Sequence, residues 1–512
     1  MKKIKRLLLS KRFLIGLVAC VQIGLFVFIT SELYIVGSTA YILLTIFSVF
    51  VMLYLFEKDN MNPSYKIIWI LFMAVFPISG AALYFFCGDT KLTRKQQEHI
   101  NGILDRSHDN ITPNPRLCRK ISLMDGGLGR QAYYLENTGF SPPYENTAVK
   151  YYDIGAAMFR DYLNDLKNAR KSIFIQYFII DEGYMWDRIM EVLKEKVADG
   201  VDVRVVYDGF GTLLTLPEDY EKTLRAAGIK AYIFNDVKFS IHIGDYLMLN
   251  HRDHRKITVI DSTIGYGGGI NIADEYINVI ERFGVWKDTG FRLEGEGVWG
   301  LTTTFLQTWE FVSGAKADYS RFRPDYGVKS DCIVQPYFDT PLDKINLCAN
   351  TYLNVVNNAK DYVYIASPYL IVDNEVLTAI TLAARSGVDV RVIVPGIPDK
   401  WYVYYVTQSY YKPLLEAGVK VYEYTPGFLH AKMYVSDDMQ AIVGGANTDY
   451  RSLYLNFENC CAFYGGEIVS RVKKDFDAMF RQSHLVTAED IRNTPLYKRI
   501  FQIAFRVLSP LM

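Results

Sequence analysis

One short pattern occurs twice in this chain, and the repetition constrains the fold more than any other feature of the sequence. Residues 250–271 read NHRDHRKITVIDSTIGYGGGIN, and residues 429–447 read LHAKMYVSDDMQAIVGGAN. Five residues recur at one constant offset of 176 positions: His254, Lys256, Asp261, Gly268 and Asn271, then His430, Lys432, Asp437, Gly444 and Asn447. Five fixed letters are expected at on the order of one in a million starting positions. The sequence therefore predicts two homologous halves.

Further repeats place both motifs within an α/β fold. NARKSIFIQYFIID at 168–181 has a counterpart in NAKDYVYIASPYLIVD at 358–373. The hexapeptide GVDVRV occurs twice without change, at 200–205 and 387–392. Between these repeats, apolar runs alternate with helical stretches, which is typical of a mixed sheet covered by helices on both faces.

Three uncharged apolar runs near the N-terminus predict a membrane anchor. They cover residues 13–30, 33–56 and 67–87, and each is long enough to cross roughly 30 Å of hydrocarbon as a helix. A cleaved lipoprotein signal is the alternative for the first run, because MKKIKRLLLSKR is basic and LVAC ends at Cys20. The run stays apolar to Thr30, which favours the anchor. FPISG at 76–80 interrupts the third run, so whether that run spans, and which side of the membrane holds the remaining chain, stay open.

These features divide the chain into five parts. We expect a membrane anchor of two or three hydrophobic helices, a linker rich in Asn, Pro and Gly, a first half, a second half and a C-terminal amphipathic helix, at residues 1–90, 91–145, 146–325, 326–490 and 491–512. The C-terminal helix has two interpretations, because its apolar face would suit either packing on the domain or insertion into the membrane interface.

Charge and cysteine content argue against several classes of protein. Lys plus Arg number 56, as do Asp plus Glu, so no overall basic field exists to attract a nucleic acid. The seven cysteines are scattered, without the paired spacing of a zinc site. We therefore expect no nucleic-acid partner, no disulfide framework, no metal and no cofactor.

The residue types of the motif predict phosphate chemistry. The residues after His254 and His430 favour a strand, in which positions i and i+2 share a face, so each histidine and the lysine two residues later point into one space. Histidine, with a pKa of about 6.5, can attack or carry a proton, and lysine supplies positive charge. Two copies facing each other would place two histidines, two lysines and two asparagines around one anion.

The paired HxKxxxxD and GGxN patterns resemble the phospholipase D superfamily, and the surrounding sequences GGINIADEY and GGANTDYRSLYLNFE are similar to those of bacterial cardiolipin synthases. The resemblance implies two phospholipase D-like halves related by a pseudo-two-fold axis, in a multi-pass protein of the bacterial cell membrane. It implies a metal-free phosphatidyl transfer between two phosphatidylglycerol molecules of the lipid bilayer, through a phosphatidyl-histidine. Family precedent makes His254 the nucleophile and His430 the acid and base, although the near-symmetry leaves the reverse open.

The resemblance also assigns supporting roles. Phosphoryl oxygens would be held by four residues: Lys256, Lys432, Asn271 and Asn447. Asp288 in WKDTGF and Glu458 in NFENC would orient the imidazoles, while Gly268 and Gly444 let backbone approach closely. Asp261 and Asp437 belong to the catalytic motif, but we expect them to be structural and to tie the motif loops to each other's backbone.

Three other functions remain in competition. The acceptor could be water or a different alcohol, which would make the protein a phospholipase D-type hydrolase or another phosphatidyltransferase. A nuclease would require a local basic groove. A membrane scaffold with a dead site would tolerate loss of either motif histidine. The oligomeric state and the selectivity for lipid donor and acceptor are left open by the sequence.

Overall fold

The computed structural model describes residues 38–58, 61–77, 80–81, 84, 94–236, 250–324 and 326–511. The chain separates into two compact units: the first comprises residues 1–97 and 235–250, and the second comprises residues 98–234 and 251–510. Each unit is described by itself.

The first unit contains the helices α3 (Ser38–Glu57) and α4 (Pro63–Val75). Asn62 begins α4, because its side chain accepts a hydrogen bond from the backbone N–H of Ser64 (3.0 Å) and Pro63 follows at the first helical position. The two helices share a small core that includes Val51, Leu55 and Met73. The predicted apolar run at 13–30 lies outside the described residues, and the other two runs are described only in part. Among the residues described, no helix combines the length and hydropathy of a membrane span.

The second unit contains two mixed sheets with the same order of strands. The first sheet runs β1-β7-β6-β5-β2-β3-β4, formed by Thr147–Tyr152, Gly290–Gly295, Ile264–Gly268, Lys256–Ile260, Ser172–Tyr177, Asp202–Asp208 and Lys230–Phe234. Strand β2 pairs parallel with β3 and antiparallel with the central strand β5, which carries the first motif.

The second sheet runs β17-β12-β11-β9-β13-β14-β16-β8, formed by Ser483–Leu485, Lys420–Tyr424, Asp389–Pro395, Tyr362–Ala366, Met433–Ser436, Gln440–Gly444, Glu458–Tyr464 and Ile333–Asp339. Without the added edge strand β17, this is the order of the first sheet read in the opposite direction, with parallel and antiparallel pairs at the same places. The prediction of two homologous α/β halves is therefore confirmed. A separate two-stranded sheet pairs β10 (Leu370–Ile371) with β15 (Thr448–Asp449).

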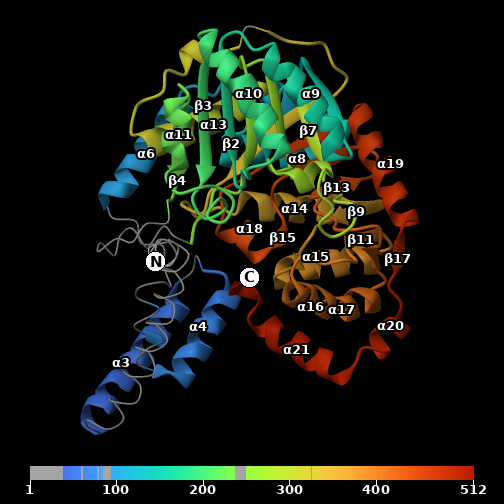
Figure 1. Ribbon diagram of the computed structural model, residues 1–512. Helices are drawn as coiled ribbons and strands as arrows, with labels where there is room; N and C mark the ends of the chain where they lie inside the picture. Colours follow the sequence, from blue (N-terminus) through green and yellow to red (C-terminus); the bar gives the residue numbers. More distant parts are fainter. Residues whose placement is uncertain are drawn as a thin grey trace. The chain divides into compact units, whose positions relative to one another are not determined.

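Helices pack against both sheets (Figure 1). The outer face of the first sheet packs on α9 (Gly155–Lys167), α10 (Tyr184–Ala198) and α11 (Tyr220–Ala226) through one apolar core. A second core joins the inner faces of both sheets and includes α13 (Val298–Ser313) and α19 (Glu467–Arg481). The second half also contains α14 (Leu347–Asn358), α15 (Asn374–Arg385), α16 (Trp401–Ser409), α17 (Tyr411–Glu416) and α18 (Tyr450–Tyr454).

Residues 94–139 form three helices where the sequence predicted a linker. These are α6 (Arg94–His108), α7 (Pro115–Met124) and α8 (Gly126–Gly139). The guanidinium of Arg106 pairs with buried Glu310 on α13 (2.5 Å), and Gln131 on α8 bonds Gln440 of the second sheet (3.2 Å). Apolar residues on one face of each helix are buried, which is why the segment packs despite its Asn, Pro and Gly content. At the other end, α20 (Ala488–Arg492) and α21 (Leu496–Val507) follow β17.

Candidate active site

Each motif histidine lies just before a central strand and is bonded to the opposite half. His254 precedes β5, and its backbone N–H donates to the carbonyl of Phe457 (2.9 Å). His430 precedes β13, and its N–H donates to the carbonyl of Lys287 (2.7 Å). Because Phe457 and Lys287 each precede an acidic residue, these bonds fix both histidines beside a carboxylate of the other half.

The carboxylates accept hydrogen bonds from the imidazoles in a reciprocal arrangement. Nδ1 of His254 lies 2.8 Å from Oε1 of Glu458, and Nδ1 of His430 lies 2.6 Å from Oδ2 of Asp288. Both carboxylates are completely buried, and the histidines are about nine-tenths buried. With Nδ1 occupied, Nε2 is the ring nitrogen left to react. The sequence anticipated both acidic residues through the family resemblance.

The two motif lysines lie beside the histidines and are also buried. Nζ of Lys256 donates to the carbonyl of His254 (2.5 Å). Nζ of Lys432 donates to the carbonyl of His430 and lies 2.8 Å from its Nδ1. The ammonium groups therefore sit at the imidazoles, where a phosphoryl oxygen would gather negative charge during attack at phosphorus.

Burial shifts the pKa of every ionisable group in this cluster toward the neutral form. It lowers the pKa of Lys256 to about 8 and of Lys432 to about 7, and it raises the pKa of Glu458 to about 8. Burial, followed by the charges of both lysines, holds the pKa of His254 and His430 well below the usual range. Since lysines from both halves act on each histidine, the two motifs form one electrostatic site. An anionic phosphodiester would restore the charge of the lysines.

The motif asparagines lie at the site with part of their amide groups already bonded. Asn271 accepts from the N–H of Ile179 (3.1 Å) and donates to the hydroxyl of Tyr276 (2.8 Å). Asn447 donates to Oδ2 of Asp449 (3.0 Å). Each Nδ2 carries a second N–H that such a bond does not use, so both residues could still bind a phosphoryl oxygen.

Sequence reasoning missed the aromatic residues that pack on the imidazoles. The ring of Phe178 lies 5.1 Å from that of His254, while Tyr276 and Trp286 lie 5.4 and 5.6 Å from that of His430. Such packing helps to hold an imidazole in one orientation. Tyr276 stands five residues after Asn271, and its proximity to the motif was the one available signal.

The glycine clusters leave room for the orienting carboxylates. A Cβ on Gly269 would lie 2.3 Å from Oδ1 of Asp288, and a Cβ on Gly445 would lie 3.2 Å from Oε2 of Glu458. Gly268 has a φ of +130°, and a Cβ there would lie 2.6 Å from the carbonyl oxygen of Thr289. A Cβ on Gly444 would meet Cys460 Sγ at 2.2 Å. The sequence predicted that the motif glycines let backbone segments approach closely. The structure shows that glycines of the clusters also leave space for the carboxylates that bond the histidines.

Asp261 and Asp437 belong to the sequence motif, but the structure places both outside the catalytic cluster. Each follows the far end of its strand and accepts backbone hydrogen bonds within its own half. Asp261 binds the N–H groups of residues 170–172 at 2.7–2.9 Å, and Asp437 binds those of residues 360–362 at 2.9 Å. Their expected structural role is supported, but the expected tie between the two motif loops is wrong.

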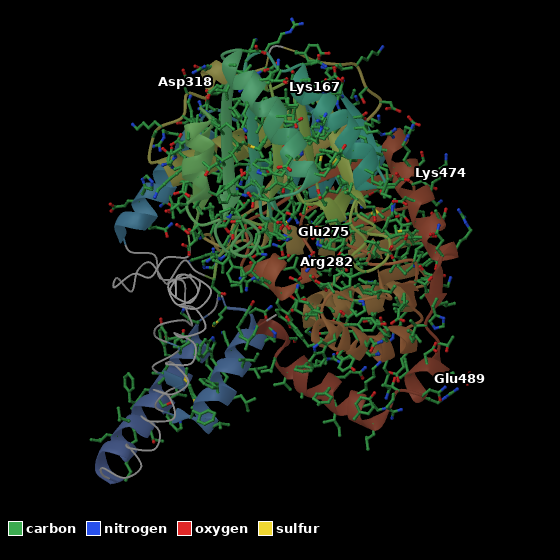
Figure 2. All side chains as sticks on the ribbon, in the orientation of Figure 1. Lys167, Glu275, Arg282, Asp318, Lys474 and Glu489 are labelled. Carbon is green, nitrogen blue, oxygen red and sulfur yellow. The ribbon has the colours of Figure 1, made fainter. Side chains whose placement is uncertain are left out.

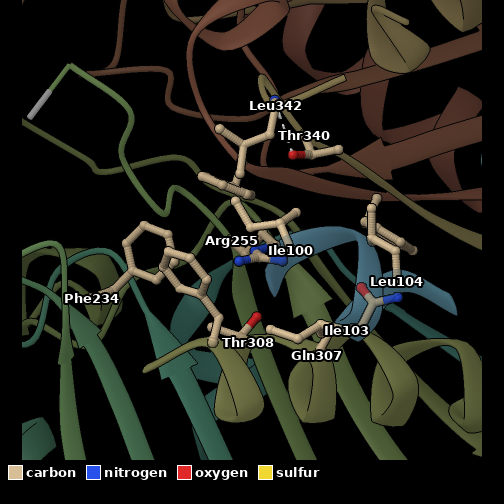
Figure 3. Close-up of a pocket in the computed structure, with 12 residues that line it drawn as sticks. Ile100, Ile103, Leu104, Phe234, Arg255, Gln307, Thr308, Thr340 and Leu342 are labelled. Atoms are coloured by element: carbon tan, nitrogen blue, oxygen red, sulfur yellow. Dashed lines mark hydrogen bonds between the residues drawn. The ribbon is translucent and has the colours of Figure 1, made fainter. Parts of the chain in front are cut away.

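A separate apolar cavity lies behind the first motif (Figure 3). Its empty volume is about 470 Å³, counted out to its open mouth, and its lining includes Ile100, Phe234, Arg255 and Phe457. Because neighbouring residues of an extended segment point to opposite sides, Arg255 faces this cavity while His254 and Lys256 face the catalytic cluster. The cavity is therefore distinct from the site of the histidines.

Known proteins are similar to this chain in sequence and in fold. Residues 162–281 and 352–480 match the family described as "Cardiolipin synthase, PLD-like domain", and residues 36–88 match "Phospholipase_D-nuclease N-terminal". A cardiolipin synthase of Halalkalibacterium halodurans is 34% identical over 493 residues, which cover 94% of this chain and 95% of that protein. An uncharacterized protein of Streptococcus mutans is 40% identical over 464 residues, covering 89% and 98%.

The crystal structure of phosphatidylserine synthase from Haemophilus influenzae superposes with a TM-score of 0.57 at 16% sequence identity. The match covers 75% of this chain and 99% of that protein. At this level of identity the likeness concerns the fold alone.

Proposed function

Because this chain belongs to the phospholipase D-like family of cardiolipin synthases, we propose that it transfers a phosphatidyl group from one phosphatidylglycerol to another, giving cardiolipin and glycerol. The observation that carries the proposal is the reciprocal pairing of His254 with Glu458 and of His430 with Asp288. Two oriented imidazoles and two lysines in one buried cluster provide a nucleophile, an acid and a binding site for a phosphodiester.

In the first step, Nε2 of one histidine attacks the phosphorus of phosphatidylglycerol. The new P–N bond forms as the bond from phosphorus to the glycerol headgroup oxygen breaks. The other histidine donates its proton to that oxygen, and glycerol leaves. Lys256 and Lys432 stabilise the negative charge that accumulates on the phosphoryl oxygens in the transition state, aided by Asn271 and Asn447.

In the second step, the terminal hydroxyl of another phosphatidylglycerol attacks the phosphatidyl-histidine. The histidine that lost its proton takes the hydroxyl proton, the P–N bond breaks, and cardiolipin is released. Both imidazoles then carry the protons with which they began. Water in place of the second lipid would give phosphatidic acid by the same steps.

We assign His254 as the nucleophile and His430 as the acid and base. A bond from Nδ1–H of His254 to Glu458 leaves a lone pair on Nε2. In His430 the bond from Nδ1–H to Asp288 leaves Nε2 to carry the second proton of the imidazolium, which is the proton given to the glycerol oxygen. The assignment follows the precedent of the family, because the two histidine–carboxylate pairs are nearly symmetric.

The assignment can be tested by trapping the intermediate. His430→Ala protein is mixed with labelled phosphatidylglycerol, quenched and digested, and the peptides are analysed for a phosphatidyl adduct. We expect the adduct on His254, and none in the His254→Ala protein. An adduct on His430 in the His254→Ala protein would reverse the two roles.

Product analysis tests the reaction itself. Purified full-length protein is incubated with labelled phosphatidylglycerol in the presence of a chelator. Cardiolipin with free glycerol is the expected result, and either His→Ala variant should lower the rate about 10³-fold or more. Phosphatidic acid alone would mean that water is the acceptor, and an unaltered rate in both variants would refute the mechanism.

The N-terminal region is proposed to anchor the enzyme in the cell membrane as a multi-pass segment. Large apolar side chains of α3 and α4 are exposed, including Phe50, Phe56 and Ile67, which supports burial in lipid. Extraction of cell membranes with alkaline carbonate should leave the full chain in the pellet, whereas release into the supernatant would contradict the anchor. Protease protection of an epitope at the C-terminus would then assign the side that holds the catalytic unit.

A further inference from the structure

Three loops with exposed apolar side chains lie near the catalytic histidines, and two of them contact residues that touch these histidines. The first loop follows β3 and carries Phe210, which is 53% exposed. Asp208 fixes this loop to the motif, because it accepts the N–H groups of Phe210 (2.8 Å) and of Asp253 (3.0 Å), the residue before His254. Gly211 in the same loop packs against the carbonyl of Phe178, whose ring contacts His254.

The second loop is the counterpart of the first in the other half. Counting from the two GVDVRV repeats, Phe210 corresponds to Ile397 and Leu214 corresponds to Trp401. Ile397 and Trp401 are also exposed, the latter by 57%. Asp399 between them accepts a hydrogen bond from Tyr369 (2.7 Å). The pKa of His430 is set chiefly by burial, and the charge of Asp399 is among those that act on it.

The third loop lies between Asn278 and Trp286, next to the boundary of the two halves. Asn278 accepts the N–H of Trp286 (2.8 Å), and this indole ring contacts His430. The loop exposes three aliphatic side chains, namely Val279, Ile280 and Val285. Arg282 in this loop pairs with Glu275 (3.0 Å), and both residues lie where the halves meet (Figure 2). Loops from both halves near the catalytic pair therefore carry exposed apolar groups.

The C-terminal helix α21 extends this apolar surface. Phe505 contacts the rings of Trp401 and Tyr402 at 5.6 and 6.5 Å, and Arg506 donates to the carbonyl of Ser409 (3.1 Å), so α21 runs beside α16 (Figure 1). The remaining face of α21 is left to solvent although it is apolar. It exposes Leu496, Tyr497, Ile500, Phe501, Ile503 and Val507, with Leu496 at 74% and Ile503 at 67%.

Charge indicates the partner of this surface. Residues 491–512 contain four basic residues and no acidic one: Arg492, Lys498, Arg499 and Arg506. An apolar helical face flanked by basic side chains and joined to exposed aromatic rings is typical of a helix that lies in the headgroup region of an anionic bilayer. A contiguous apolar face of this kind is uncommon on a protein surface that contacts only water.

We propose that the three loops and α21 form a docking surface for a bilayer of anionic phospholipid. The proposal rests on the proposed function, because docking there would bring the loops around the histidines into contact with lipid. A phosphodiester in the headgroup layer could then reach Nε2 while its acyl chains stay among other lipids. Because of docking, kcat/KM is higher for a substrate in a bilayer than for a soluble, short-chain molecule with the same headgroup.

The test compares one variant on two forms of the substrate. Leu496→Gln, Ile500→Gln and Ile503→Gln are combined in the full chain. We expect kcat/KM on phosphatidylglycerol vesicles to fall about 10-fold or more, because three aliphatic side chains that docking would bury in lipid are replaced by polar ones. Activity on monomeric dihexanoyl phosphatidylglycerol should stay within about two-fold. Ile280→Gln with Ile397→Gln should give the same pattern.

The matched control replaces equally exposed residues elsewhere. This control combines three substitutions on α7 and α8: Leu123→Gln, Met124→Gln and Tyr133→Gln. Leu123 is 83% exposed, and the control should leave activity on both substrates unaltered. If the α21 variant loses activity equally on vesicles and monomers, or on neither, the docking surface is refuted. A variant that changes only the oligomeric state by sedimentation would assign the face to a second copy of the chain, which also overturns the proposal.

A second readout separates this proposal from the proposed function. Hydrogen exchange of residues 496–507 is measured in the wild-type chain held in phosphatidylglycerol bilayers and in neutral phosphatidylcholine bilayers. We expect slower exchange in the anionic bilayer. Slower exchange without any cardiolipin synthesis would retain the docking surface and refute the function, whereas equal exchange with full synthesis would do the reverse.

Discussion

At the residue scale, the catalytic cluster joins groups that burial alone would neutralise. Glu458 and Asp288 are fully buried, and each is held beside an imidazole of the other half. The motif histidines and lysines could be predicted from the sequence because each pair lies two residues apart and the pair occurs twice. The aromatic residues Phe178 and Trp286 could not, because their contacts with the imidazoles depend on how distant loops pack.

Glu458→Gln should stabilise the protein while it impairs catalysis. Burial raises the pKa of Glu458 to about 8, well above its ordinary value of 4.5. The carboxyl group therefore favours folding below pH 4.5, and this contribution is lost as the pH rises toward 8. The glutamine has no such loss, so the difference in melting temperature between variant and wild type should widen from pH 5 to pH 8.

Thermal unfolding across this range, with kcat measured beside it, tests the prediction. We expect the melting temperature to rise by about 1 °C for each kcal/mol of stability gained in a unit of this size. We also expect kcat to fall by about 10²-fold or more, because an amide holds the tautomer of His254 less strictly. A pH-independent difference in melting temperature would show that Glu458 is ionised in the folded protein.

Gly269→Ala should reduce activity more than Gly445→Ala, although the two glycines are equivalent in the repeat. A methyl group at 269 would overlap Oδ1 of Asp288, whereas at 445 it would be only tight against Glu458. We expect kcat to fall about 10- to 100-fold in Gly269→Ala, and the fold-change in Gly445→Ala to be less than half as large. Gly102→Ala, which meets only the flexible end of Arg106 at 3.5 Å, is the control. Equal losses would argue against displacement of Asp288.

At the scale of elements, each motif both supplies catalytic side chains and bounds a strand. Its histidine precedes β5 or β13, and its aspartate follows the same strand. Asp261 and Asp437 each collect three backbone N–H groups at the start of a neighbouring strand. The helices α6–α8 were missed because Asn, Pro and Gly are frequent in 91–145, while the run of apolar positions that buries Leu117, Ile121 and Leu135 is short in each helix. Packing of α6 against α13 of the first half and of α8 against the second half, rather than local propensity, keeps these helices folded.

Asp261→Ala should destabilise the fold with little effect on the chemistry of the folded enzyme. Three N–H groups at residues 170–172 would lose their acceptor, which costs about 1–3 kcal/mol in total at a partly exposed site. Denaturant unfolding should show this loss, and kcat per folded molecule at 20 °C should stay within about two-fold of wild type. Asp261→Asn retains one acceptor oxygen and should be intermediate. A large fall in kcat without loss of stability would return Asp261 to the catalytic set.

At the scale of the whole catalytic unit, neither half is complete without the other. One apolar core contains strands of both sheets together with α13 and α19, and each imidazole is oriented by a carboxylate from across the boundary. The repeat in the sequence predicted two halves of one fold. It could not reveal this exchange of partners, because the acidic residues lie outside the repeated motif and at unequal distances from it.

This arrangement predicts that two inactive variants cannot rescue each other. His254→Ala and His430→Ala chains, each inactive, are co-expressed with different affinity tags and purified together in mild detergent. Because both histidines and both carboxylates of the cluster come from one chain, every mixed assembly still holds only defective sites, so cardiolipin synthesis should stay at the level of the separate variants. A chain with both substitutions, co-expressed with wild type, controls for expression. Recovery of about a quarter or more of wild-type activity would mean that halves are exchanged between chains, as in a domain-swapped dimer.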